Sequence, residues 1–340
     1  MSAAGRAGFR LLRLDAAAPP APSALSAVAE LLVPAGGPIF AGHFPGRPLL
    51  PGIAHLALVC QVFEELAARG ILGGEPSGNT AIAEVRRFRL RREIVPGDRI
   101  ELRVQRIDEI DTARAAGAVD EAGAVGDAGA VDAAGAVSAA GAARDAGAES
   151  GVFRFELRRQ PAAGQPGQPG KIASEGTVRT GIGSGSTPAA ATIRRPELAP
   201  GGPFPPVADL VPHAPPSRLL AEVLAAGAGG IRCAGSIPTD HPLAAGGEAP
   251  GFLAIELGAQ AAAALEALAR HPGGRPRIGY LVGVRDAHVP ARLPTGRTLS
   301  VVAVPAGAAA ALSIYEIAVA EQGAAAPVAT GTISTFVPEP

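Results

Sequence analysis

The stretch from Gly42 to Gln61, GHFPGRPLLPGIAHLALVCQ, holds a histidine in a turn rich in proline and glycine, directly before an apolar helix. A Pro-Gly pair just ahead of the helix indicates a well-defined helix start. A histidine held in this way is a candidate general base, because its pKa lies close to neutral pH. Proton-transfer chemistry usually needs a second titratable group, and this helix offers Ala57 where a facing carboxylate is expected.

A second histidine, His241, precedes another Pro-Gly turn and another apolar helix, and that helix contains a carboxylate, Glu256. A lone carboxylate among apolar residues is costly to bury ionised, so it needs a partner or a raised pKa. Gln260 lies four residues further on, on the same helix face, and can orient the carboxyl group. The alternative is an exposed glutamate near a helix start, stabilised by the helix dipole.

Histidines at equivalent places in two halves of the chain favour a functional role for His43 and His241. A single histidine in a turn is more often a hydrogen-bonded structural residue. We interpret His213 as structural, because it lies at the opening strand of the second half. His271 is interpreted as a helix C-terminal residue favoured by the helix dipole, and His288 has no identifiable partner in the sequence.

Composition narrows the classes of partner and compartment. A formal net charge of -1 provides no broad field for nucleic acid or an anionic membrane surface. Cys60 and Cys233 lie far apart in apolar surroundings, which fits neither a disulfide framework nor a metal site. Neither a signal-peptide core nor an apolar run of about 18 residues occurs, so we expect a soluble cytoplasmic protein without a membrane span.

The order of elements repeats along the 340 residues: a turn with histidine, one long apolar helix, then strand-like runs. We expect an α+β protein of two units, because about 100 to 200 residues per domain is usual. The predicted ranges are a tail over 1–22, a first unit over 23–182, a linker over 183–206 and a second unit over 207–340. Each helix is apolar nearly all round and should be wrapped by its own antiparallel sheet.

Residues 107–150 interrupt the first unit with glycines that recur every six residues. Such a period is typical of a left-handed β-helix. The segment is long enough for barely two coils and has no bulky side chains to stack. We therefore interpret it as a low-complexity Ala/Gly insert, since so little apolar surface cannot offset the backbone entropy.

The run from His43 to Gly52, HFPGRPLLPG, resembles the signature of the β-hydroxyacyl-acyl-carrier-protein dehydratases of the hotdog superfamily. In the second half, VPHAPP at 211–216 and the segment from Asp240 to Gln260 resemble the related dehydratase-like proteins of aryl polyene pathways. The resemblance covers most of the chain outside the insert and the linker. It implies a tandem, or double, hotdog that forms an intramolecular pseudo-dimer.

The resemblance also implies a mechanism. A histidine from the turn removes the α-proton of a 3-hydroxyacyl thioester, and a Glu or Asp on the central helix protonates the departing hydroxyl group. Backbone N–H groups at the helix start hold the thioester carbonyl. By position, Gly52 supplies that donor beside His43, and Gly251 supplies it beside His241.

This sequence departs from the family pattern at one place. Members carry the acid fourteen residues after the histidine, where this chain has Ala57, although Gln61 matches the glutamine that follows. His55 points about 200° away from Ala57 around the helix and should not face the same pocket. Hotdog dimers build each site across their interface, so the resemblance implies one complete pair, His43 with Glu256, and one dead pair, His241 with Ala57. Polyketide synthase dehydratase domains are similar in this respect, and the Glu256 to Gln260 spacing fits them.

We expect a dehydratase whose substrates are 3-hydroxyacyl thioesters on acyl carrier protein, with Gln260, Gly52 and Gly251 assisting binding and no metal or redox cofactor. Two alternatives stay open: a hotdog thioesterase, and a non-catalytic partner that binds acyl carrier protein.

Five arginines between Arg86 and Arg92 form either a solvated sheet face or a docking site for the carrier protein or its phosphate. A further homodimer is also open.

Overall fold

The computed structural model describes residues 7–16, 25–72, 80–108, 151–161, 170–182, 198, 203–270, 277–309, 312–324 and 326–338. The predicted Ala/Gly insert beyond residue 108 lies outside these residues, as do most of the predicted linker and His271.

The first half combines one long helix with six strands. In chain order its elements are β1 (Arg10–Ala16), β2 (Ser26–Leu32), the short 3-10 helix η2 (Pro38–Phe40), α2 (Ala54–Ala68), β3 (Thr80–Leu90), β4 (Arg99–Ile107), β5 (Val152–Arg159) and β6 (Lys171–Ile182). Strand β1 lies inside the stretch predicted as an N-terminal tail, so the first sheet begins earlier than expected. Its alternation is weak, because most of its side chains are exposed.

The second half repeats this plan. Its elements are α4 (Val207–Leu210), β7 (Leu220–Gly227), β8 (Gly230–Gly235), β9 (Glu248–Pro250), α5 (Leu253–Ala269), β10 (Tyr280–His288), β11 (Arg292–Pro294), β12 (Leu299–Ala309), β13 (Leu312–Glu321) and β14 (Ala329–Phe336). The runs predicted as strands from sequence, such as RIELRVQRI and LSIYEIAVAE, form β4 and β13. Strands β9 and β11 pair separately from the main sheet.

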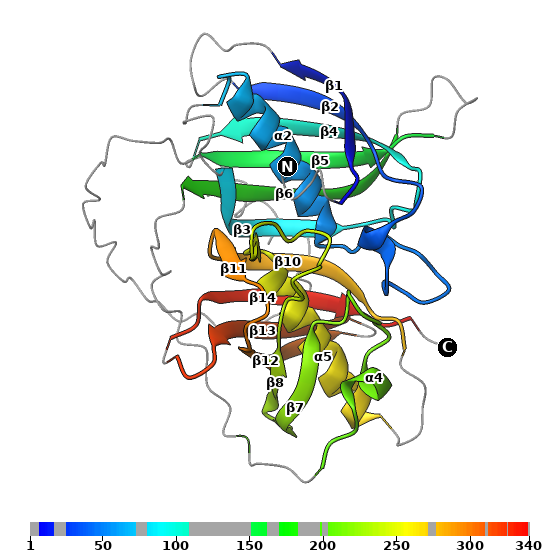
Figure 1. Ribbon diagram of the computed structural model, residues 1–340, viewed down its shortest axis with the longest axis vertical. Helices are drawn as coiled ribbons and strands as arrows, with labels where there is room; N and C mark the ends of the chain where they lie inside the picture. Colours follow the sequence, from blue (N-terminus) through cyan, green and yellow to red (C-terminus); the bar gives the residue numbers. More distant parts are fainter. Residues whose placement is uncertain are drawn as a thin grey trace, which may run out of the picture.

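One antiparallel sheet of 12 strands runs through both halves, in the order β1-β2-β4-β5-β6-β3-β10-β14-β13-β12-β8-β7. The order is the same when read inward from either edge, with β3 matched by β10 and β4 by β12, which is the pattern of a pseudo-two-fold axis. The halves meet where β3 pairs with β10, for example Val284 with Phe88. Figure 1 shows this junction, with the first half above it and the second half below.

Both long helices are buried on several faces, as their apolar composition predicts. Helix α2 buries Leu56, Val59 and Phe63 among others, and α5 buries Ile255, Leu257 and Ala261. At Gly258 of α5, an added Cβ would lie 2.6 Å from the Ile317 side chain of β13. Helix and sheet therefore approach so closely that only glycine fits there without a shift.

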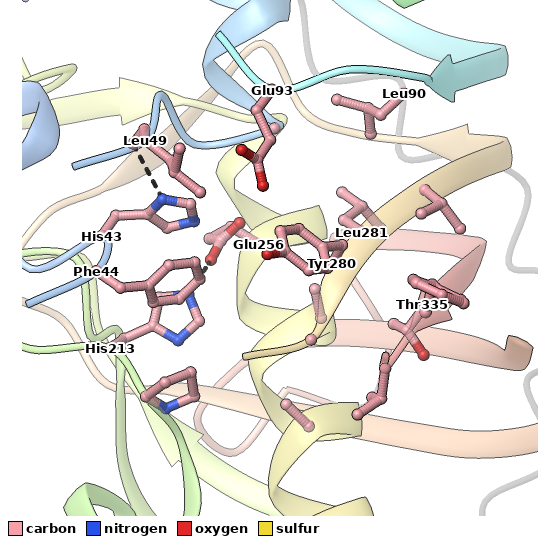
Figure 2. A pocket seen from close by; sticks show the side chains of 18 of the residues that line it. His43, Phe44, Leu49, Leu90, Glu93, His213, Glu256, Tyr280, Leu281 and Thr335 are labelled. Atoms are coloured by element: carbon pink, nitrogen blue, oxygen red, sulfur yellow. Dashed lines mark hydrogen bonds and ion pairs between the residues drawn. The ribbon is translucent and has the colours of Figure 1, made fainter. Parts of the chain in front are cut away.

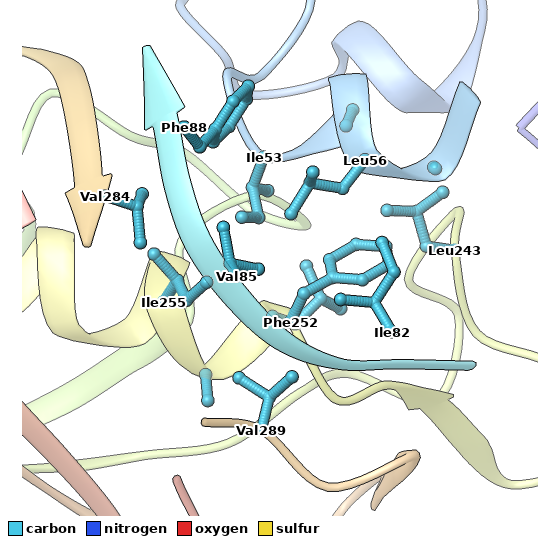
Figure 3. Close-up of a cluster of buried hydrophobic side chains, with 14 of the residues drawn as sticks. Ile53, Leu56, Ile82, Val85, Phe88, Leu243, Phe252, Ile255, Val284 and Val289 are labelled. Atoms are coloured by element: carbon cyan, nitrogen blue, oxygen red, sulfur yellow. The ribbon is translucent and has the colours of Figure 1, made fainter. Parts of the chain in front are cut away.

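The cores of the two halves are continuous across the junction. Figure 3 shows Phe88 and Val85 of β3 beside Val284 of β10, with Ile53 and Ile255 from the starts of the two helices on either side. A core shared in this way ties the relative position of the halves to the same apolar burial that stabilises each one.

In the part of the chain that the structure describes, no helix is both long enough and apolar enough to cross a membrane.

Replacing Phe88 by Ala should lower the free energy of unfolding by about 3–5 kcal/mol, because it empties a fully buried site at the junction. The matched control is Phe336→Ala on β14, whose side chain is 38% exposed. Urea denaturation followed by circular dichroism measures both variants. Equal losses in the two would contradict the view that the junction is a major source of stability.

Candidate active site

A cavity of about 360 Å³ lies at the junction of the halves. Its lining comes from both: the turn that follows η2 and the start of α2 on one side, and the loop before β7, α5 and β10 on the other. The lining residues used below are His43, Phe44, Gly52, His55, Arg91, Arg92, His213, Glu256, Glu266, Arg270, Arg277 and Tyr280. The structure thus brings His43 and Glu256 into one cavity, although they are 213 residues apart in the chain.

His43 has a defined tautomer. Its Nδ1 lies 3.1 Å from the Leu49 carbonyl oxygen, which can only accept, so Nδ1 carries the hydrogen and Nε2 has the free lone pair. The ring faces the cavity and is therefore partly exposed, but protein surrounds it. This burial lowers the pKa of His43 to about 4, against the opposing effect of the Leu49 hydrogen bond. At neutral pH the ring is an uncharged base.

The pKa of Glu256 is shifted in the opposite direction to that of His43. Burial raises the pKa of its carboxyl group, while a hydrogen bond from Gln260 lowers it in part. The Gln260 Nε2 donates to Glu256 Oε1 over 2.9 Å. The side chain lies within the first turn of α5 and is only 9% exposed. The alternative prediction from the sequence, that Glu256 is exposed, is therefore wrong.

Gln260 uses its whole side-chain amide inside the protein. Besides Glu256, its Nε2 donates to the Ser217 carbonyl over 2.8 Å, and its Oε1 accepts from the Leu219 N–H over 2.9 Å. It is fully buried and is not among the cavity-lining residues. The prediction that Gln260 binds substrate is therefore wrong. The residue orients Glu256 and attaches the loop before β7 to α5.

The turn that carries His43 is docked on that same loop. The Ala214 N–H donates to the Gly42 carbonyl over 3.0 Å, and the Ser217 hydroxyl donates to the Ala41 carbonyl over 2.6 Å. Gly42 has φ +78°, and an added Cβ would lie 1.9 Å from the Ala214 oxygen. Glycine is required at this position both for its backbone conformation and for the close approach of the two loops.

His213 lies close to both the predicted base and the predicted acid. Its ring centroid is 5.2 Å from that of His43 and 4.9 Å from that of Phe44, and its Nε2 is 3.5 Å from Glu256 Oε1. Figure 2 shows the two histidines and Glu256 converging at one end of the cavity. Burial, and then the neighbouring His43, lower the pKa of His213 well below its usual value. The structural role predicted for His213 does not account for this position.

His241 differs from His43 in its tautomer and its surroundings. The Leu243 N–H donates to its Nδ1 over 3.2 Å, so Nδ1 is an acceptor and the hydrogen lies on Nε2. Burial lowers the pKa of His241 to about 4, opposed by Asp240. His241 and Ala57 do not line the cavity, whereas His55 does, with its Nδ1 2.9 Å from the Ser174 hydroxyl.

The two glycines predicted as amide donors also differ. Gly52 lines the cavity, and within the described residues no acceptor contacts its N–H. The Gly251 N–H donates to the Ala291 carbonyl over 3.3 Å, and a Cβ added there would collide with the Pro290 oxygen. The prediction that Gly251 binds substrate is wrong, because its amide is already paired and its backbone is packed against the next segment.

Gln61 occupies the place in α2 that Gln260 has in α5. Its Nε2 makes one long hydrogen bond, 3.4 Å, to the Phe9 carbonyl just before β1. Its Oε1 is buried and has no hydrogen-bond partner among the residues that the structure describes. With Ala57 in place of a glutamate, this half retains the glutamine but only a remnant of the network around it.

The two halves match two dehydratase families. Residues 205–340 match the ApeP-like family, described as ApeP dehydratase, and residues 21–121 match the ApeI-like family, described as ApeI dehydratase. Both halves of the chain are therefore similar to dehydratase families. The resemblance stated from the sequence motifs is confirmed.

Relatives of the chain include the 3-hydroxyacyl-[acyl-carrier-protein] dehydratase FabZ of Photorhabdus laumondii, 39% identical over 72 residues, which are 21% of this chain and 48% of that protein. FabZ of Haemophilus influenzae is 42% identical over 74 residues, again 21% of this chain and 48% of that protein. The chain thus spans about half the length of the curated relatives it matches.

The double-hotdog fold is shared with polyketide synthase dehydratase domains. The dehydratase domain of PpsC from Mycobacterium tuberculosis superposes with a TM-score of 0.54 over 96% of this chain and 97% of that chain, at 12% sequence identity. At this identity the likeness concerns the fold alone, and it confirms the predicted α+β tandem hotdog.

Gln260→Leu should lower the free energy of unfolding by about 1–3 kcal/mol for each buried group left unpaired, namely the Leu219 N–H and the Ser217 carbonyl. The matched control is Gln61→Leu, which removes one long hydrogen bond and an unpartnered oxygen and should cost less than about 1 kcal/mol. Denaturant titration of both variants gives the comparison. A larger loss in Gln61→Leu would show that the inferred asymmetry is wrong.

Proposed function

We propose that this protein is a dehydratase that eliminates water from 3-hydroxyacyl thioesters carried by acyl carrier protein, giving trans-2-enoyl thioesters. The observation that carries the proposal is the pair His43 and Glu256 in one cavity, with opposite shifts of pKa. A base that is uncharged and an acid that is protonated at the same pH are the two groups that a syn or anti elimination needs.

In the proposed reaction, His43 Nε2 takes a proton from C2 of the substrate. The electrons of that C–H bond form the C2=C3 double bond, and the C3–O bond breaks. The departing hydroxyl group takes the proton of Glu256 and leaves as water. His43 is then protonated and Glu256 ionised, and proton exchange with solvent returns both to their starting states.

Charge that develops on the thioester carbonyl during proton removal needs a donor. Gly52 is the candidate, since it lines the cavity at the start of α2 and its N–H has no acceptor among the described residues. An open amide at a helix N-terminus is suited to a developing oxyanion. No acidic residue occupies the first turn of α2 to compete for it.

The cavity is long enough to admit an extended substrate. It follows one face of α5 from Glu256 to Glu266, which at about 1.5 Å per residue is about 15 Å. Arg91, Arg92, Arg270 and Arg277 line it together with Glu266. Guanidinium groups suit the phosphate of a phosphopantetheine arm or an acidic carrier protein, which supports acyl carrier protein as the partner.

His43→Ala and Glu256→Gln should each lower kcat at least about 100-fold, because each removes a proton-transfer group. His241→Ala should retain activity, since His241 lies outside the cavity. Mass spectrometry of a 3-hydroxyacyl carrier protein after incubation detects the loss of water. Unimpaired turnover by His43→Ala would overturn the proposal, and release of free carrier thiol without an enoyl product would favour a thioesterase.

The pH dependence of kcat/KM should be bell-shaped. Activity should fall as the pH decreases through the pKa of His43, about 4, because the base becomes protonated. It should fall again as the pH rises through the raised pKa of Glu256, because the acid ionises. Circular dichroism at each pH separates this loss from unfolding. A rate that keeps rising through neutral and alkaline pH would contradict the assignment of Glu256 as the acid.

A further inference from the structure

His213 is a buried side chain in the cavity that the elimination itself does not use. It is 9% exposed, and its Nδ1 has no hydrogen-bond partner within the described residues. Its ring packs edge-on against Phe44, and its loop is attached to the first half through Ala214 and Ser217. Buried polar atoms nearly always have a hydrogen-bond partner, so a fixed ring with one unpaired nitrogen indicates a functional role in the cavity.

The unpaired Nδ1 indicates which nitrogen carries the hydrogen. With the hydrogen on Nδ1, a buried N–H would lack an acceptor while the Nε2 lone pair faced Glu256 Oε1, another acceptor. With the hydrogen on Nε2, an N–H faces Oε1 at 3.5 Å and only a weak acceptor is left unpaired. The second arrangement pairs donors with acceptors and is the one that the contacts favour.

Two N–H groups then converge on the same oxygen of Glu256. Gln260 Nε2 lies 2.9 Å and His213 Nε2 lies 3.5 Å from Oε1. The carbonyl oxygen of a carboxylic acid is a better acceptor than its hydroxyl oxygen, so two donors at Oε1 favour the carboxyl proton on Oε2. The acid is thereby held with one oxygen fixed by the protein and the other free to protonate a substrate.

We propose that His213 is a positioning residue for Glu256, whose Nε2–H stabilises the carboxylate that forms when the acid gives up its proton. This inference rests on the proposed function. At 3.5 Å the contact is longer than a normal hydrogen bond, so it contributes little while Glu256 is protonated. Once Oε1 shares a full negative charge, the bond becomes charge-assisted and shortens. The interaction is stronger in the transition state than in the ground state, which is the condition for accelerating the reaction.

Amide side chains that mimic one ring nitrogen each provide the test. In His213→Gln the amide nitrogen takes the place of Nε2, whereas in His213→Asn it takes the place of Nδ1. His213→Asn should lower kcat by about 10-fold to 100-fold with little change in KM, the range for a hydrogen bond to a charged group. His213→Gln should recover most of this loss. A similar loss in both variants would mean that the ring serves packing alone.

The titration of Glu256 gives a second reading that does not depend on turnover. Carbon-13 NMR of labelled glutamate carboxyl groups, with Glu256→Gln to assign the signal, follows its pKa in each variant. Loss of a donor to the carboxylate should raise the pKa of Glu256 in His213→Asn relative to both the wild type and His213→Gln. His213 contacts Glu256, and His43, His55, Glu93, Glu266 and Tyr280 are further titratable residues that line the cavity. Because His43 also packs against His213, the titration is repeated in His43→Ala.

The two levels of failure are distinguishable. If the wild-type protein never releases water from the substrate, the proposed function is wrong. The Glu256 titration would still report whether His213 contacts the carboxylate. An unchanged Glu256 pKa in His213→Asn, whatever the turnover, would overturn the positioning role.

Discussion

The site depends on the close contact between two loops from different halves of the chain. Hydrogen bonds from Ala214 and Ser217 to the carbonyl groups of Gly42 and Ala41 fix the turn that carries His43 against the loop that carries His213. Since the proposed base, His43, comes from one half and the proposed acid, Glu256, from the other, this contact sets their relative position. The shared core behind β3 and β10 keeps the two loops in register, and a side chain at Gly42 would separate them.

Because the two halves are related by a pseudo-two-fold axis, equivalent residues can be compared, and they differ in their hydrogen bonds. Gln260 makes three hydrogen bonds that join Glu256, Ser217 and Leu219. Gln61 makes one long bond, and its oxygen has no partner in the described part of the chain. His43 presents a free Nε2 lone pair, whereas His241 carries its hydrogen on Nε2. Each difference lies in the local hydrogen-bond partners of a side chain. The two halves therefore share one fold but place equivalent residues in chemically different environments.

The fold, and two residues that the structure places in one cavity, could be predicted from the sequence for identifiable reasons. Strand alternation and apolar helices reveal burial, and His43 lies in a long motif. Glu256 was found because a carboxylate in an apolar helix is conspicuous. Strand β1 could not be predicted in this way, because its side chains alternate only weakly between buried and exposed. The hydrogen bond between Gly251 and Ala291 has no sequence pattern that would predict it.

His213 shows where sequence reasoning ends. Its loop reads as a proline-rich connection, and its partners are His43 and Phe44, about 170 residues earlier, and Glu256, 43 residues later. The one available signal was that a histidine stands in each stretch that resembles a dehydratase motif. Gln260 was correctly expected to orient Glu256, but its bonds to Ser217 and Leu219 depend on how closely the loop approaches α5. Such distances follow from packing, which a single sequence does not specify.

A crystal structure of the Glu256→Gln variant with a bound 3-hydroxyacyl pantetheine thioester would show whether one site is composed from both halves. We expect the acyl group in the cavity at the junction, with C2 within about 3–3.5 Å of His43 Nε2 and the 3-hydroxyl group in hydrogen-bond contact with the side chain at position 256. An acyl group bound beside His241 and Ala57, or with its C2 turned away from His43, would contradict a single site composed from both halves.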